Sequence, residues 1–92
     1  MKTYRIKIMP HATRSLKKLK KERELLERLD GEIFSLAENP RPRESKKLRS
    51  ARHRNLYRMR VGDWRILYAI QDDALIVLTL EVVHRAQAYR AG

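Results

Sequence analysis

The first part of the chain spaces its apolar side chains in two ways, by alternation and then by a helical repeat. Residues 3–9 alternate polar and apolar side chains, which predicts a half-buried strand. Pro10 ends this strand and suits the first turn of a helix. The apolar side chains that follow at helical spacing are Ala12, Leu16 and Leu19. A short, basic helix is therefore expected directly after the strand.

A longer stripe at spacings of three and four residues predicts a second helix. Its apolar side chains are Leu26, Leu29, Ile33 and Leu36, with Phe34 and Ala37 widening the stripe. The acidic residues at its start, which complement the positive end of a helix dipole, are Glu22, Glu24 and Glu27. The pair Asn39-Pro40 is expected to end this helix, because a residue before proline disfavours the helical conformation. Residues 40–55 then show no stable period and predict a basic connecting loop, with Leu48 as its one apolar anchor.

Two runs rich in aromatic and β-branched residues flank the pair Gly62-Asp63, which predicts a tight β-hairpin. Strand side chains alternate between faces, so the apolar face is expected to carry Tyr57, Met59 and Val61. The opposite face then carries Leu56, Arg58 and Arg60. If Val61 lies opposite Trp64, Arg60 lies opposite Arg65. Like charges placed opposite one another destabilise a sheet, so three arginines on one face indicate a bound polyanion.

The remaining segments complete the predicted fold. After a turn at residues 71–74, the apolar run at 75–80 predicts a central strand that continues to His84-Arg85. The expected order is one strand, two helices and three antiparallel strands. This order is typical of the α+β class, with two helices packed on one small sheet. No repeat or linker divides the 92 residues, so a single domain over residues 1–92 is expected.

The charge is large and uneven. The formal net charge is +11, and nine Lys or Arg side chains against one acid lie in residues 41–60. Residues 22–39 are instead net acidic, with six acids against two arginines. Such a basic chain is expected to bind an anionic partner, either nucleic acid or an acidic protein. The sequence has no cysteine, no long apolar run and no apolar signal segment at its start, so a cytoplasmic location without membrane binding is expected.

Several kinds of site find little support in the sequence. Only three glycines are present, so no glycine-rich phosphate loop exists. The three histidines lie far apart in the chain, which argues against a metal site. No Ser or Cys is placed with a His and an acid as a nucleophilic triad requires. The remaining candidates for catalytic residues are therefore the arginines of the hairpin and the residues at the end of the last strand and after it.

These candidates can meet if the last strand pairs beside the second hairpin strand. The candidate catalytic residues are Arg58, Arg60, Arg65, His84, Arg85 and Tyr89. Guanidinium groups bind phosphate in a bidentate manner and can stabilise the charge of a phosphorane. An aromatic ring beside them can stack on an unpaired base. The candidate RNA-binding residues of the basic segment are Lys46, Lys47, Arg49, Arg52 and Arg54. Tyr57, Trp64 and Tyr68 are expected to pack in the core instead.

The chain resembles the RelE branch of the RelE/ParE toxin superfamily over almost its whole length. The resemblance lies in the run Tyr-Arg-Met-Arg-Val-Gly-Asp-Trp-Arg-Ile-Leu-Tyr at residues 57–68, in His84-Arg85 and in Tyr89-Arg90. It implies a RelE-like, microbial ribonuclease-type fold and a toxin that cuts messenger RNA in the ribosomal A site without a metal or other cofactor. The partners it implies are messenger and ribosomal RNA, a cognate RelB-like antitoxin, and operator DNA only through that antitoxin.

The resemblance also implies roles for single residues. Arg65 would stabilise the transition-state phosphate, Arg85 would contact the leaving-oxygen side, and Tyr89 would stack on or orient a base. Arg58 and Arg60 stand where the best-known members carry lysines, one of them proposed as the general base. A guanidinium group stays protonated in proteins and is a poor proton acceptor. The base is then weak, or another group serves as base, or Arg58 acts only electrostatically. His84 is the nearby candidate, unless it is simply a strand-end residue that faces solvent.

Two other functions compete with the nuclease. The ParE branch of the same fold poisons DNA gyrase and is not a nuclease. A second alternative is a catalytically weak member that binds nucleic acid or regulates an operator with its partner, which the loss of the lysines keeps open. The concentrated set of Arg58, Arg60, Arg65, Arg85 and Tyr89 argues against the gyrase inhibitor.

Overall fold

The computed structural model describes residues 3–88, and its elements follow the predicted order with two additions. The elements are β1 (Arg5–Ile8), α1 (Pro10–Lys18), α2 (Arg23–Ser35), β2 (Ser45–Leu48), β3 (Leu56–Val61), β4 (Trp64–Gln71), β5 (Ile76–His84) and α3 (Arg85–Ala88). The first strand, the two helices and the three closing strands are confirmed. The additions are β2 and α3. Among the helices of residues 3–88, none has the length and apolar character needed to cross a membrane.

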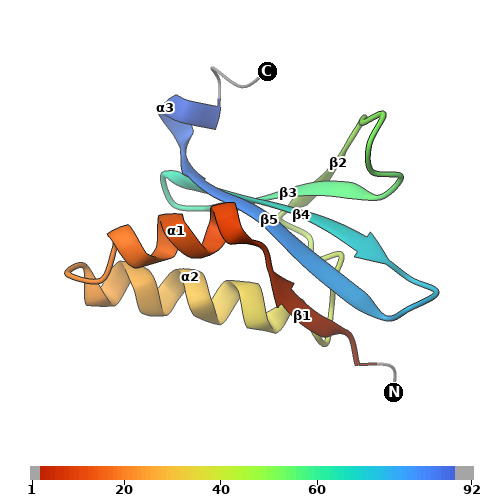
Figure 1. Ribbon diagram of the computed structural model, residues 1–92, viewed down its shortest axis with the longest axis horizontal. Coiled ribbons are helices and arrows are strands. Elements are labelled where there is room, and N and C mark those ends of the chain that lie inside the picture. Colours follow the sequence, from red (N-terminus) through yellow and green to blue (C-terminus); the bar gives the residue numbers. More distant parts are fainter. Residues whose placement is uncertain (1–2, 89–92) are drawn as a thin grey trace.

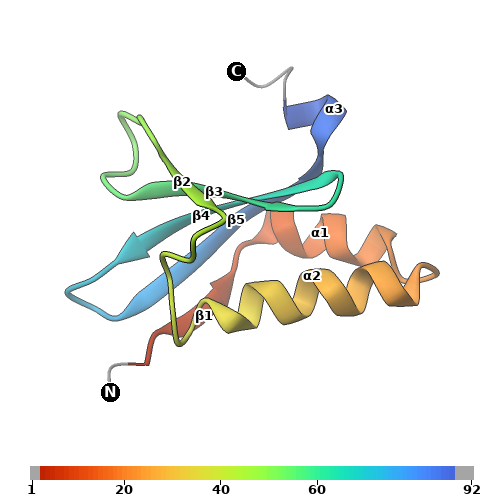
Figure 2. The same cartoon turned by 180° about the vertical axis from the view of Figure 1, so that it is seen from behind.

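The five strands form one sheet in the order β1-β5-β4-β3-β2. β1 runs parallel to β5, and the other neighbouring pairs are antiparallel. Figure 1 shows α1 and α2 together on one side of this sheet, and Figure 2 shows the same layers from behind. The short α3 follows the end of β5 and lies apart from α1 and α2. The predicted α+β class, with two helices packed on one sheet, is confirmed.

The core lies between these two helices and one face of the sheet, which we call the core face. Its fully buried side chains from the sheet include Met59, Ile66, Tyr68, Val77 and Val82. The helices contribute Ala12, Leu19, Leu29, Ile33 and Leu36. Burying one such large apolar side chain stabilises the fold by about 1.5–3 kcal/mol. Phe34 was expected to widen the stripe, but this prediction is wrong, because the side chain is 55% exposed. It follows Ile33 directly and is therefore turned about 100° around the helix, away from the sheet.

The prediction of an irregular loop over residues 40–55 is also wrong in its middle, where β2 forms. β2 pairs antiparallel with β3, from Ser45 opposite Met59 to Leu48 opposite Leu56. It is an edge strand, and two lysines on a short edge strand are a common protection against pairing with other chains. The strand owes its existence to this pairing, so its own residues show no period that would reveal it.

The hairpin between β3 and β4 is confirmed in both its position and its register. Val61 lies opposite Trp64, and the two-residue link is Gly62-Asp63. Gly62 has a φ of 60°, and Asp63 is not among the residues with positive φ. A positive φ at the first link residue alone fits a type II′ turn, which favours glycine at that position.

The pairing of β4 with β5 contains a β-bulge that decides where Glu81 points. Leu67 lies opposite Glu81, but the next residue, Tyr68, lies opposite Thr79, so Leu80 is the extra residue. Tyr68 and Thr79 are buried on the core face. Strict alternation would place Glu81 on that same face, two residues beyond Thr79. The bulge turns Glu81 to the opposite face of the sheet.

A polar cluster around Asp72 stabilises the end of the sheet that lies away from the Gly62-Asp63 turn. Asp72 accepts a hydrogen bond from the Tyr4 hydroxyl at 2.6 Å and from two nitrogens of Arg41 at 3.1 and 2.8 Å. The hydrogen bond to Asp72 raises the pKa of Tyr4, because it holds the proton on the phenol beside a carboxylate. Arg41 Nε also donates to the hydroxyl of Tyr57 at 3.0 Å. The cluster joins β1, the segment before β2 and the turn between β4 and β5.

Candidate functional site

The face of the sheet opposite the core face carries the hairpin arginines, and we call it the arginine face. Arg60 lies directly opposite Arg65, as predicted, and Arg58 lies opposite Leu67. Directly opposite residues point to the same side of a sheet. All three arginines therefore belong to the arginine face. Arg60 is exposed, Arg58 is half-buried and Arg65 is buried.

Arg65 is buried because it holds the hairpin turn. Only 5% of its surface is exposed, and its Nη1 donates to the carbonyl oxygens of Gly62 at 3.0 Å and of Trp64 at 2.8 Å. A charged donor is expensive to bury without such acceptors. Nη1 is thus engaged with the turn, so this arginine is fixed in place and reaches a phosphate only through the rest of its guanidinium group.

Arg58 has a buried nitrogen with nothing to bind. Within residues 3–88, its Nε is inaccessible to solvent and finds no hydrogen-bond acceptor. Leaving a buried donor unpaired costs about 1–3 kcal/mol, and more for a charged group. The atom is covered by protein in this arrangement, so a ligand could bind to it only after the Arg58 side chain moves.

A row of paired residues crosses the sheet at Arg58. Lys46 on β2 lies opposite Arg58, and Leu67 on β4 lies opposite both Arg58 and Glu81. These residues share the arginine face. The row therefore runs from two cations at the β2 edge to one carboxylate on β5, with an apolar side chain between them.

A cleft of about 790 Å³ lies along this row and against α1. It is lined by His11, Ser15, Lys18, Leu19, Leu48, Arg49, Leu56, Arg58, Trp64, Leu67, Glu81, Val82, Val83 and Gln87. The lining combines apolar side chains with a few charged ones, which is typical of ligand sites. The hairpin arginine that enters this cleft is Arg58.

Two cleft residues were not predicted from the sequence as functional. His11 Nε2 and Glu81 Oε1 lie 3.9 Å apart across the cleft, from α1 to β5. They are separated by 70 positions in the chain (11 and 81), so no local spacing reveals them. The one available signal was a carboxylate inside an apolar strand, at Glu81. The face of the sheet to which Glu81 points depends on the bulge, and the sequence does not show the bulge.

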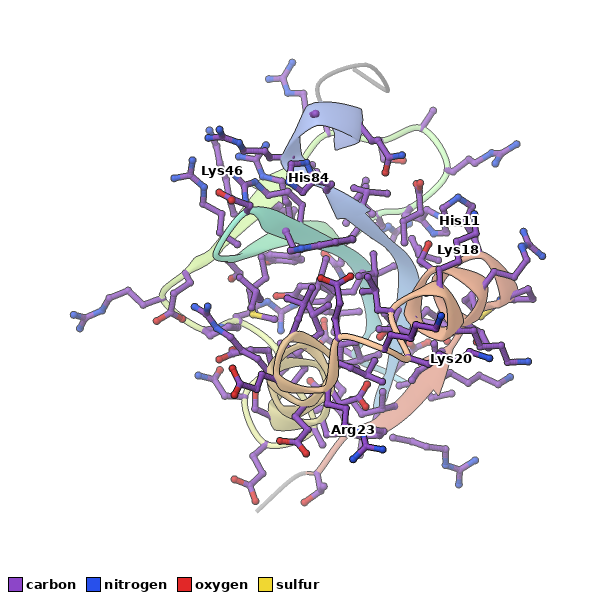
Figure 3. The ribbon with its side chains drawn as sticks, turned by 90° about the vertical axis from the view of Figure 1, so that its left-hand side faces the viewer. His11, Lys18, Lys20, Arg23, Lys46 and His84 are labelled. Atoms are coloured by element: carbon purple, nitrogen blue, oxygen red, sulfur yellow. The ribbon has the colours of Figure 1, made fainter. Side chains whose placement is uncertain are left out.

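The structure does not bring His84 to the arginine face. His84 lies opposite Trp64, on the side of the sheet that faces the core, and its ring contacts the Trp64 ring edge-on with centroids 5.6 Å apart. Its Nδ1 accepts a hydrogen bond from the Ala86 backbone N–H at 3.3 Å. In Figure 3 the labelled His84 lies below α3, apart from the labelled His11 and Lys18 on α1. His84 is therefore badly placed to act beside Arg58.

Arg85 lies at the hairpin turn. Its backbone N–H donates to the Asp63 carbonyl oxygen at 2.8 Å, and its Nε is 3.9 Å from Asp63 Oδ1. The side chain is 59% exposed, so this ion pair leaves Arg85 accessible. β5 pairs beside β4, and this confirms the arrangement expected to bring Arg85 near the hairpin. Tyr89 and Arg90 lie outside the described residues.

The basic segment divides between the two sides of the sheet edge. Lys46 belongs to the arginine face, whereas Lys47 lies opposite Tyr57 and so points to the other side. Arg49 lines the cleft, and Arg52 and Arg54 are exposed in the connection to β3. The predicted set of five RNA-binding residues is therefore adjacent in space but does not form one flat surface. Within residues 3–88, no group of three His, Cys, Asp or Glu side chains is placed to hold a metal ion.

The α+β fold, with helices packed on one five-stranded sheet, matches the fold of solved RelE toxin structures. A family model described as the ParE toxin of type II toxin–antitoxin systems, parDE, matches residues 6–89. The chain therefore belongs to the RelE/ParE superfamily of type II toxin–antitoxin toxins. A comparison with curated protein sequences found no match.

Solved structures agree with this assignment. The chain is 30% identical to a chain of the archaeal RelE–RelB complex from Pyrococcus horikoshii, with a TM-score of 0.77, and the match covers 92% of this chain and 98% of that one. It is also 30% identical to a chain of the RelBE2 toxin–antitoxin complex from Mycobacterium tuberculosis, with a TM-score of 0.74 and coverage of 90% and 99%. The isolated Escherichia coli RelE toxin shares the fold at 20% identity, with a TM-score of 0.71 and coverage of 96% and 97%.

Proposed function

We propose that this toxin is an endoribonuclease that cleaves messenger RNA in the ribosomal A site and so stops translation. The observation that carries the proposal is the arginine face, where Arg58, Arg60 and Arg65 share one side of a hairpin beside a cleft. Repulsion between directly opposed cations costs stability, and a polyanion would offset it.

The nucleophile of the proposed reaction comes from the RNA itself. The ribose 2′-hydroxyl oxygen attacks the adjacent phosphorus, and the bond from phosphorus to the 5′-oxygen of the next nucleotide breaks. The products are a 2′,3′-cyclic phosphate and a 5′-hydroxyl. Charge accumulates on the phosphorane during the attack, and fixed guanidinium groups are suited to stabilise it. Arg58, Arg60 and Arg65 take this role, and Arg85 at the hairpin turn stabilises the leaving oxygen.

The basic segment and the last residues of the chain would hold the RNA. The RNA-binding side chains are Lys46, Lys47, Arg49, Arg52 and Arg54. Phosphate contacts of this kind position a nucleic acid without reading its sequence. Tyr89 would stack on a base, a contact worth about 1–3 kcal/mol. In the cytoplasm a cognate RelB-like antitoxin would cover the basic surface, and the toxin would meet operator DNA only through that antitoxin.

A gyrase inhibitor is the second candidate, because the family model that matches the chain is described as a ParE toxin. The concentration of arginines along one face, next to a cleft, favours the nuclease instead. A catalytically weak member that only binds nucleic acid or regulates an operator is the third candidate.

Induction of the chain in bacteria tests the proposal. Primer extension on a few abundant transcripts, with translation running or blocked, maps the cleavage sites. We expect cuts inside translated frames that disappear when translation is blocked. Cuts that persist without translation would contradict the ribosome requirement. Arrested replication without any cuts would favour the gyrase inhibitor, and neither effect would favour the weak binding protein.

A further inference from the structure

The nuclease proposed above still lacks a general base. The reaction requires a group that takes the proton of the 2′-hydroxyl, and a guanidinium group cannot do so in its protonated form. His84, the candidate from the sequence, contacts Trp64 on the other side of the sheet and accepts a hydrogen bond from the Ala86 N–H. His84 does not line the cleft that Arg58 enters, whereas another histidine does.

His11 and Glu81 are placed for this task. Both line the cleft that Arg58 also lines, and 3.9 Å separates His11 Nε2 from Glu81 Oε1. Both side chains are also accessible, with 52% and 40% of their surfaces exposed. Histidine is the side chain that most often serves as a general base. A carboxylate next to the imidazole stabilises the cation that forms when the imidazole takes a proton.

The pair also lies at a suitable distance from Arg58. Leu67 lies opposite both Arg58 and Glu81, so the two residues are separated by two strand spacings, or ~10 Å between Cα atoms. Both side chains are long and enter the same cleft. A phosphate bound at Arg58 would thus have its neighbouring ribose near His11. The bulge at Leu80 is what turns Glu81 to this face, and bulges are common beside active sites.

We propose that His11 is the general base of the cleavage reaction and that Glu81 is its positioning residue. This inference rests on the proposed function. Glu81 faces Nε2 of the imidazole and leaves Nδ1 free to accept a proton. As the 2′-oxygen bonds to phosphorus, its proton passes to Nδ1 and later returns to solvent. The 5′-oxygen leaves with the electron pair of the broken bond and takes a proton from solvent, so atoms and charge balance.

The charged side chains that line the cleft together with His11 are Lys18 on the same helix, Arg49 after β2, Arg58 on β3 and Glu81 on β5. Of these, Glu81 makes the contact with the imidazole, at 3.9 Å. The residue of α3 that reaches the cleft, Gln87, is uncharged. Imidazole groups take up a proton between about pH 5 and pH 8. Cleavage by the intact protein is therefore expected to slow as the pH falls through this range.

Single-turnover cleavage on ribosomes that carry a defined messenger RNA tests the pair. The toxin, separated from its antitoxin, is used in excess over ribosomes from about pH 5.5 to about pH 8.5. We expect His11→Ala to lower the rate constant by about 10²- to 10⁴-fold and to lose the acid-side pH dependence. Free imidazole should restore part of the rate. Glu81→Gln should lower the rate at saturating toxin concentration less than His11→Ala does and leave the concentration dependence of the rate unchanged, because the imidazolium loses its carboxylate while RNA binding is kept.

Glu32→Gln is the matched control, since Glu32 is exposed on α2, away from the arginine face. It should leave the rate and the profile unchanged. A protein that cleaves normally with His11→Ala, at an unchanged pH dependence, would overturn the base assignment and leave the proposed function standing. An unchanged rate at saturating toxin concentration with Glu81→Gln would overturn the positioning role. Absence of cleavage by the unaltered toxin would overturn the proposed function and this inference together.

Discussion

Arg60 and Arg65 lie opposite one another on the arginine face, yet they differ in what surrounds them. Arg60 is exposed, whereas Arg65 is buried and donates to two carbonyl oxygens of the hairpin. The sequence predicted that the two would be opposed, because alternation and turn length determine register. It did not predict the burial of Arg65, which results from hydrogen bonds to the turn. Arg60 is thus a solvent-exposed cation, whereas Arg65 also has a structural role in the turn.

This difference predicts separate effects of two substitutions. Arg65→Ala should lower the free energy of unfolding by about 1–3 kcal/mol, because it removes a buried charged donor from two carbonyl oxygens. Arg60→Ala should change stability by less than about 0.5 kcal/mol, as expected for an exposed side chain. Both should weaken the growth arrest caused by induction. Urea denaturation together with growth after induction separates the two effects, and equal stability of the two variants would contradict the structural role of Arg65.

Tyr68 predicts how stability responds to alkaline pH. Burial in the core raises the pKa of Tyr68 from 10.0 to about 12, and its hydroxyl donates to the Pro40 carbonyl oxygen at 2.8 Å. The raised value means that the folded state holds the proton more tightly than the unfolded state. Its stabilising contribution is therefore complete below pH 10 and is lost as the pH rises toward 12.

Tyr68→Phe tests this expectation. The variant should lose stability at neutral pH by about 1 kcal/mol, because it lacks the hydrogen bond to the carbonyl. Between about pH 10 and pH 12, however, its stability should decline less steeply than that of the unaltered protein. Thermal unfolding monitored by circular dichroism across this range measures both. Parallel declines of the two proteins would contradict the role of Tyr68.

At the scale of elements, the sequence predicted the helices and strands whose own residues show a periodic pattern or a turn signal. It missed the features that form only by pairing with a neighbouring strand. α1, α2 and the β3–β4 hairpin carry period and turn signals in their own residues. β2 lacks them, because an edge strand of two lysines forms only by pairing with β3. The bulge at Leu80 is likewise a property of two paired strands. The cleft pair of His11 and Glu81 depends on this bulge, so sequence reasoning could not find it.

The hairpin turn predicts a test at this scale. Gly62 has a φ of 60°, and an added Cβ would lie 3.3 Å from Arg28 Nη1. The contact is with the end of a flexible side chain, so the strained backbone is the larger cost. Gly62→Ala should therefore lower the free energy of unfolding by about 1–2 kcal/mol. Gly62→Asn should lose a similar amount, because asparagine tolerates the left-handed helical conformation and not the first position of a type II′ turn. Urea denaturation measures both variants, and unchanged stability of either one would contradict this account of the turn.

At the scale of the whole molecule, acidic and basic segments lie in different places. The acidic segment forms α2, which packs on the core face beside the basic helix α1. The hairpin arginines lie on the arginine face, and the basic segment lies at the β2 edge with side chains on both sides of the sheet. The sequence indicated this separation through its blocks of charge.

This separation predicts how RNA binding depends on salt. Each phosphate contact to single-stranded RNA contributes a slope of about −0.7 in a plot of log affinity against log salt. Arg52→Ala or Arg54→Ala should therefore make the slope shallower by about this amount, because each removes one contact of the basic segment. Arg23→Ala on α2 is the control and should leave the slope unchanged. Fluorescence anisotropy with a labelled RNA measures these slopes, and an unchanged slope in all three variants would remove the basic segment from the interface.

The central claim is that this member of the RelE/ParE superfamily is a nuclease and not a gyrase inhibitor. One preparation of the purified toxin, divided between two reactions, tests it most directly. The first contains ribosomes with a defined messenger RNA, and the second contains DNA gyrase with relaxed plasmid. We expect cleavage of the ribosome-bound RNA, a product ending in a 2′,3′-cyclic phosphate, and normal supercoiling of the plasmid. Intact RNA together with blocked supercoiling would contradict the claim.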